Sequence, residues 1–142
     1  EHLRPDHVCY ASVIHAWSKS NHPEAPQRAM ALFNRVRHNH AILQIQPNRS
    51  MYGGVLAAFS RAQSQQTGDD FYAQQAMKLF DEMKHDYASN GNKLAKPDVQ
   101  TYSIVMQAWS KSLDPNKATK VWNMFLEMKH AYEVGGDKDM CP

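Results

Sequence analysis

The chain repeats one two-part sequence pattern three times, and this repetition limits the folds that it can adopt. The first part begins at a tyrosine and ends in Ser-Lys/Arg-Ser/Ala; its copies cover residues 10–20, 52–62 and 102–112. The second part contains Leu/Met-Phe and ends in Lys/Arg-His; its copies cover residues 29–38, 76–85 and 121–130. Short repeated units bury their apolar surfaces by stacking on their neighbours. The sequence therefore predicts an array of stacked units.

Both parts of the pattern show the spacing of amphipathic helices. Apolar residues recur at intervals of three and four, as in Tyr52, Val55, Leu56 and Phe59. A proline followed by an acidic or amide residue precedes each first part, and the oxygen of that side chain can accept a backbone N–H of the helix. These predicted N-caps are Asp6, Asn48 and Asp98.

Polar segments rich in turn-forming residues separate the two helices of every unit. They cover residues 20–23, 63–70 and 113–116. Each unit is therefore predicted to be an antiparallel helical hairpin, and the fold to be all-α, an α-solenoid of stacked hairpins. Counting from proline to proline, we expect a single array over residues 1–142, an excerpt of a longer one. Its repeats cover 5–46, 47–96 and 97–141, and Pro142 starts a truncated fourth.

Aromatic residues occupy equivalent positions in the three units, and we expect them to form the core rather than a stacking surface for bases. In the first helices they are Tyr10, Tyr52 and Tyr102, followed by Trp17, Phe59 and Trp109. In the second helices they are Phe33, Phe80 and Phe125. Burial of a phenylalanine at these positions predicts a cost of about 3–5 kcal/mol on truncation to alanine.

Composition excludes several classes of function. No apolar run approaches the length of a membrane span, and the net charge of +2 is too small for a general polycation. Cys9 and Cys141 lie far apart without a CxxC partner, so we expect reduced thiols and neither a disulfide framework nor a zinc cluster. No phosphate loop, metal-spaced His/Glu set or nucleophile motif is present. We predict a protein that is not an enzyme, with no cofactor, metal, membrane or small-molecule substrate.

The Pro-Asp openings, the tyrosine near the start of each first helix and the Ala-x-x-Leu-Phe-x-x-Met second helix resemble the pentatricopeptide repeat family. The resemblance extends over nearly the whole chain. It implies a right-handed superhelix that binds single-stranded RNA on its concave surface, with one base facing each repeat. It also implies a location in the mitochondrion or chloroplast, with a targeting segment outside this sequence, and a role in RNA processing, stability or translation.

The resemblance also implies positions that contact bases. The family reads a base with the residue after the first-helix tyrosine and the residue after the next opening proline. Here the base-reading residues are Ala11 with Asn48, Gly53 with Asp98, and Ser103. Of the three first readers only Ser103 has a hydrogen-bonding side chain, which by resemblance favours a purine. The base-clamping positions, two residues before each tyrosine, are Val8, Ser50 and Gln100.

Three cations, Lys19, Arg61 and Lys111, occupy one aligned position at the end of the first helices. An extended single strand could have its phosphates neutralised by them along the groove. Alternatively, each cation complements the negative end of its helix dipole.

His38, His85 and His130 also align, each after a lysine or arginine. They could form a basic, pH-sensitive ladder or simply mark cationic helix ends. The alternative function for the whole chain is a protein-interaction scaffold, or a structural subunit of an organellar ribonucleoprotein.

Overall fold

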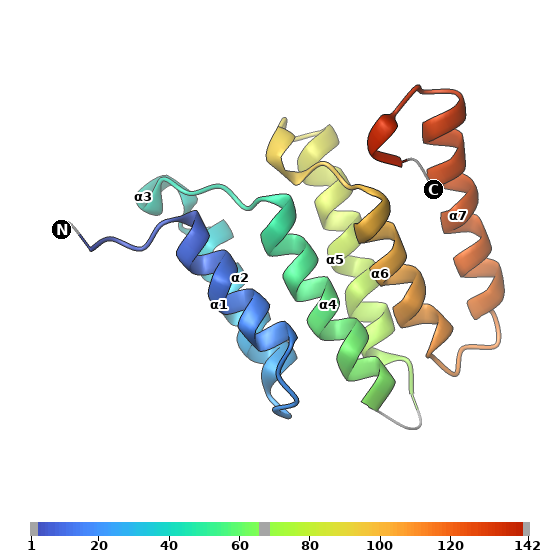
Figure 1. Cartoon of the computed structure of the whole chain (residues 1–142), viewed down its shortest axis with the longest axis horizontal. Coiled ribbons are helices and arrows are strands. Elements are labelled where there is room, and N and C mark those ends of the chain that lie inside the picture. The colour runs from blue at the N-terminus through green and yellow to red at the C-terminus, as the bar shows by residue number, and fades with distance from the viewer. Residues whose placement is uncertain (1–2, 66–68, 141–142) are drawn as a thin grey trace.

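The structure, a computed structural model, describes residues 3–65 and 69–140, and in these residues it contains helices and no strand (Figure 1). The predicted all-α class is confirmed. The α-helices are α1 (His7–Ser18), α2 (Ala25–His38), α3 (His40–Leu43), α4 (Arg49–Gln65), α5 (Phe71–Ala88), α6 (Val99–Ser110) and α7 (Lys117–Glu133). Two 3-10 turns, η1 (Lys93–Ala95) and η2 (Lys138–Met140), follow α5 and α7.

The long helices pack as three consecutive pairs, α1 with α2, α4 with α5 and α6 with α7. Figure 1 shows α1, α4 and α6 side by side, with α4 in contact with both of the others. The second helices of the first two pairs also contact the next first helix: α2 packs on α4, and α5 packs on α6. The apolar surface of one pair is thus covered by the pair that follows it.

All three predicted N-caps are confirmed. Asp6 accepts the N–H of Cys9 at 3.0 Å, which holds the pKa of the Asp6 carboxyl below its usual value. The side chain of Asn48 accepts the N–H of Met51 at 2.9 Å. At α6, Asp98 accepts the N–H of Thr101 at 2.9 Å, and the Thr101 hydroxyl accepts the N–H of Asp98 at 2.8 Å. This reciprocal pair is a capping box, which satisfies two backbone donors at the helix start.

The connections agree with the prediction at residues 20–23 and 113–116, which are not helical, but differ at 63–70. Helix α4 continues to Gln65, because Gln63 is a buried part of the core and not of a turn. The Gln63 amide donates to the Asp69 carbonyl at 2.7 Å and its oxygen accepts the Ala73 N–H at 2.9 Å. A polar residue joins α4 to α5 here because its hydrogen bonds are satisfied. Residues 66–68 lie outside the described part.

The aromatic core forms between consecutive pairs. Phe33 and Phe80 are fully buried, and their rings meet Tyr52 and Tyr102 edge-on. The expected burial of Phe125 is wrong, because this ring is only partly buried on α7. Phe33 and Phe80 are each covered by the following pair, whereas no helical pair follows α7 among the described residues.

The first-helix aromatics show the same dependence on neighbours. Phe59 and Trp109 are buried together with the tyrosines of α4 and α6, as predicted. Tyr10 and Trp17 on α1 are only partly buried. Helix α1 has a neighbouring first helix on one side only, so its aromatic positions keep some exposure.

Buried tyrosines should make the fold sensitive to alkaline pH. Burial and, secondarily, Asp86 raise the pKa of Tyr52 above its ordinary value near 10, and burial and Glu127 raise the pKa of Tyr102. Above pH ~10 the unfolded chain releases these protons while the folded chain retains them, so the free energy of unfolding should fall as pH rises. The free energy of unfolding, measured by urea denaturation at several pH values in this range, should fall less steeply with pH for the Tyr52→Phe/Tyr102→Phe variant than for the unmodified chain. Equal declines in the two proteins would contradict this prediction.

Candidate nucleic-acid interface

A hollow of about 650 Å³ lies across α1, α4 and α6. Its floor includes Gly53 and Ala57 of α4, which have little or no side chain. A Cβ atom added at Gly53 would have no atom within 4 Å, so the space above it is open. A second hollow of about 400 Å³ shares Ala57, Arg61 and Ile104 with the first and extends to Lys111. The two hollows form one continuous surface along the first helices, which we call the first-helix groove.

The first-helix groove brings together most of the residues predicted to contact RNA. The residues that line it are Ser50, Gly53, Asp98, Gln100, Lys19, Arg61 and Lys111. The other predicted residues do not line either hollow. Val8 is exposed at the start of α1, and Ala11, Asn48 and Ser103 are partly exposed.

The three aligned cations occupy different helix positions. Lys19 and Lys111 are the C-caps of α1 and α6, where a cation also complements the helix dipole. The expectation that Arg61 ends its helix is wrong, because α4 extends four residues beyond it. The Arg61 guanidinium donates to the Asn21 side-chain oxygen at 2.6 and 3.1 Å. In residues 3–65 and 69–140, none of the three cations forms an ion pair, so their charges remain available to an anion.

Two of the predicted base-reading side chains already have partners. One Asp98 carboxylate oxygen caps α6, and the other lies 3.4 Å from the Arg49 guanidinium. Asn48 uses its carbonyl oxygen as the cap of α4, while its amide N–H groups have no partner among the described residues. Asn48 can therefore still donate a hydrogen bond to a ligand. Asp98 would first have to release Thr101 or Arg49 before its carboxylate could accept a hydrogen bond from a ligand.

Sequence reasoning missed His15, which forms part of the groove wall. Its Nε2 lies 2.9 Å from the Ser50 hydroxyl and links α1 to α4. The equivalent positions of the other first helices, Ala57 and Gln107, line the groove as well. A sequence signal existed, because these three positions lie four residues before the aligned cations and so share their helix face.

Arg49 was also missed, and it organises the junction between the second and third units. Its Nε donates to the Lys96 carbonyl at 2.7 Å, and its terminal nitrogens lie 3.4 Å from Asp98 and 3.7 Å from Asp139. Lys96 in turn lies 3.0 Å from both Asp137 and Asp139. Hydrogen bonds to these carboxylates raise the pKa of Lys96 and, through Lys96, lower the pKa of Asp139. Sequence periodicity does not predict this network, because the partners of Arg49 lie in the segments that follow α5 and α7 and not on a repeated helix face.

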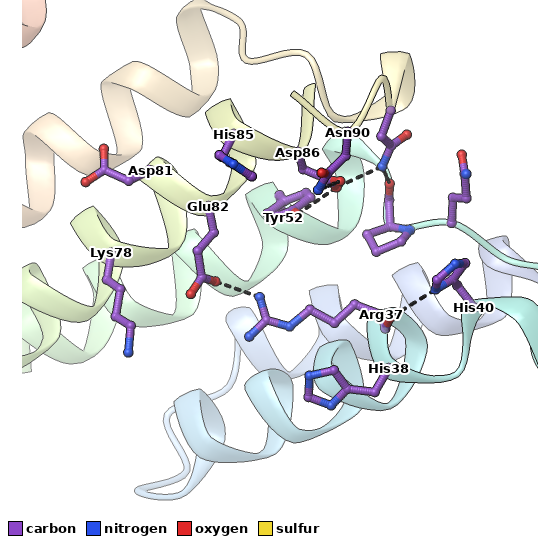
Figure 2. Close-up of a pocket in the computed structure, with 13 residues that line it drawn as sticks. Arg37, His38, His40, Tyr52, Lys78, Asp81, Glu82, His85, Asp86 and Asn90 are labelled. Carbon is purple, nitrogen blue, oxygen red and sulfur yellow. Dashed lines mark hydrogen bonds and ion pairs between the residues drawn. The ribbon is translucent and has the colours of Figure 1, made fainter. Parts of the chain in front are cut away.

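A larger hollow of about 1000 Å³ opens on the other side of the chain, around α2 and α5 (Figure 2). His38 and His85 both line it, whereas His130 does not, so the expected histidine ladder is only partly assembled. Its centre is occupied by paired charges, because Arg37 lies 2.6 Å from Glu82 (Figure 2). The permanent cations here, Arg37 and Lys78, are outnumbered by the carboxylates of Asp81, Glu82 and Asp86. This surface is a poor site for a polyanion.

Other kinds of site find no support in the described residues. No group of three or more His, Cys, Asp or Glu side chains there is placed to hold a metal ion. None of the described helices is both long and apolar enough to cross a membrane. Cys9 is an exposed free thiol, and Cys141 lies outside the described part.

Comparisons of the chain with protein-family models, with curated proteins and with solved structures find no match. The resemblance to pentatricopeptide repeats therefore rests on the repeated residues themselves.

Proposed function

We propose that this chain is an α-solenoid of pentatricopeptide type, wound as a right-handed superhelix, that binds single-stranded RNA in the first-helix groove. The observation that carries the proposal is the placement of Lys19, Arg61 and Lys111 along one groove without carboxylate partners. By resemblance to the family, the bound RNA would be an organellar transcript whose processing, stability or translation depends on the protein. This function is non-enzymatic.

The chemistry of the groove suits an extended single strand. The aligned cations can neutralise phosphates and release condensed counterions, which supplies affinity that does not depend on sequence. His15, Ser50 and Gln100 offer hydrogen-bonding groups beside the open floor at Gly53. Polar side chains at this position can contact base edges once the phosphates fix the strand in the groove.

The proposal predicts strongly salt-dependent binding of a labelled random-sequence single-stranded RNA. With three phosphates neutralised, the slope of log affinity against log salt is roughly −2, so raising salt from about 50 to about 200 mM weakens binding about 20-fold. The Lys19→Ala/Arg61→Ala/Lys111→Ala variant should bind weakly at low salt and lose most of this slope. Fluorescence anisotropy titrations at several salt concentrations measure both quantities.

A matched control removes three exposed cations from the second helices, in the variant Arg35→Ala/Lys78→Ala/Lys129→Ala. It lowers the net charge by the same amount and should keep nearly the affinity and salt slope of the unmodified chain. Equal losses in both variants would show that binding follows net charge and not the groove. If the unmodified chain fails to bind RNA at low salt, the RNA-binding function is wrong.

A protein-interaction scaffold is the second candidate function. It is favoured by exposed apolar side chains on α7, where Trp122 is 58% and Leu126 is 42% exposed. Large apolar side chains left on a surface are typical of contact sites for other proteins. Association with a purified partner that survives nuclease treatment would support this function, and loss of the complex on nuclease treatment would count against it.

A further inference from the structure

Helix α1 places His15 among the cations of the first-helix groove. His15 lines the larger hollow of the groove together with Lys19, Arg49 and Arg61. Lys19 follows four residues later and shares the same helix face. The only carboxylate among the described residues that line this hollow is Asp98, which already caps α6 and lies 3.4 Å from Arg49. His15 therefore faces permanent cations, and the one carboxylate beside them is engaged.

The ring of His15 is held between α1 and α4. Its Nε2 atom lies 2.9 Å from the Ser50 hydroxyl of α4. A Cβ atom added at Gly54 would lie 3.4 Å from His15 Cε1 and 3.5 Å from His15 Nδ1, so the missing side chain gives this edge of the ring room against α4. A hydroxyl can donate to a bare ring nitrogen or accept from a protonated one. The contact with Ser50 is therefore compatible with both charge states of His15.

The other elements near His15 present no further charge to it. Helix α2, which also packs on α1, contributes none of the described residues that line this hollow. Apart from the three cations and Asp98, the described lining residues are uncharged. Of the histidines in residues 3–65 and 69–140, His15 alone lines either hollow of the groove, whereas His38 and His85 line the hollow around α2 and α5.

We propose that His15 is a further phosphate-binding residue of the groove and that it acts in its protonated form. Histidine is the side chain that ordinarily changes charge between about pH 5 and about pH 8. The neighbouring cations disfavour a proton on His15 before RNA binds, and a phosphate placed beside the ring favours one. RNA binding therefore takes up a proton, and the affinity rises as pH falls. The inference rests on RNA binding in the first-helix groove and adds a pH-dependent regulation to that site.

The test measures binding of a labelled oligouridylate to the full chain at about pH 8 and at about pH 5.5. Uracil bases do not titrate in this range, so a change of affinity reports on the protein. The affinity at low salt should be on the order of tenfold higher at the lower pH. The slope of log affinity against log salt should steepen from roughly −2 to roughly −3, because a fourth phosphate contact is added.

Two substitutions separate the charge of His15 from its packing, and circular dichroism checks that both variants fold. His15→Gln keeps a polar side chain without a titratable charge, so its affinity should stay near the high-pH value at both pH values. His15→Lys carries a permanent charge, so at about pH 8 it should bind nearly as tightly as the unmodified chain does at about pH 5.5. If His15→Lys binds no tighter than the unmodified chain at the higher pH, His15 has only a structural role and the proposal is overturned.

The matched control removes two histidines from the hollow on the other side of the chain, in the variant His38→Gln/His85→Gln. It should keep the full pH dependence of the unmodified chain. Loss of the pH dependence in this control, with its retention in His15→Gln, would contradict the assignment. Salt-dependent binding with equal affinity at both pH values would overturn the role of His15 and leave RNA binding in place. Absence of binding at low salt and at either pH would overturn both.

Discussion

Replacing Phe80 with alanine is expected to lower the free energy of unfolding by about 3–5 kcal/mol. Phe80 is fully buried and packs against Tyr102 of the following unit, and the Lys84 ammonium lies over its ring, 4.9 Å from the centroid. The surrounding helices cannot close the space left by the ring, because they are held by contacts to units on both sides. Since domains of this size are stable by only about 5–15 kcal/mol, the loss is a large fraction of the total.

Urea denaturation followed by far-ultraviolet circular dichroism measures this loss. Phe125→Ala is the matched control, because it removes the same ring from the same repeat position at a partly buried site. Its cost should be about 1–2 kcal/mol, since less apolar area returns to water on unfolding. Equal costs at the two positions would show that the junction between units contributes nothing to the burial of Phe80.

Two adjacent glycines of α4 are expected to respond in opposite directions to alanine. A Cβ atom at Gly54 would lie 2.6 Å from Ile14 Cγ2 and 3.4 Å from His15 Cε1. Ile14 is fully buried, so the added methyl group should force Ile14 or α4 to shift, and Gly54→Ala should destabilise the chain by about 1–3 kcal/mol. At Gly53 a Cβ atom meets nothing within 4 Å, and Gly53→Ala should stabilise the helix by about 0.5–1 kcal/mol.

The same denaturation experiment compares the two variants, which differ only in the position of one methyl group. A midpoint below that of the unmodified chain for Gly54→Ala, and above it for Gly53→Ala, would confirm the close approach of α1 to α4. Stabilisation of both variants would mean that α1 lies farther from α4 than the structure places it.

Much of the candidate interface could be found from aligned positions, because equivalent residues of successive units lie along the same face. Lys19, Arg61 and Lys111 were identified in this way, and they line the first-helix groove. His15 shares that face and could have been found by the same rule. Arg49 could not, because its partners Lys96 and Asp98 lie in the connector between α5 and α6 and Asp139 lies in η2, and how close these segments come to Arg49 depends on how the units pack.

The sequence alone determined the all-helical class, the helix starts at Asp6, Asn48 and Asp98, and the pairing of helices along the chain. These features depend on local periodicity and on hydrogen bonds between residues three apart, which any helix forms by itself. Only the tertiary structure decided that Gln63 is a core residue, that Asp98 is engaged by Arg49, and that Phe125 remains partly exposed. Burial and charge pairing at those positions depend on which helix lies opposite, and a repeated pattern is the same whether or not a neighbour covers it.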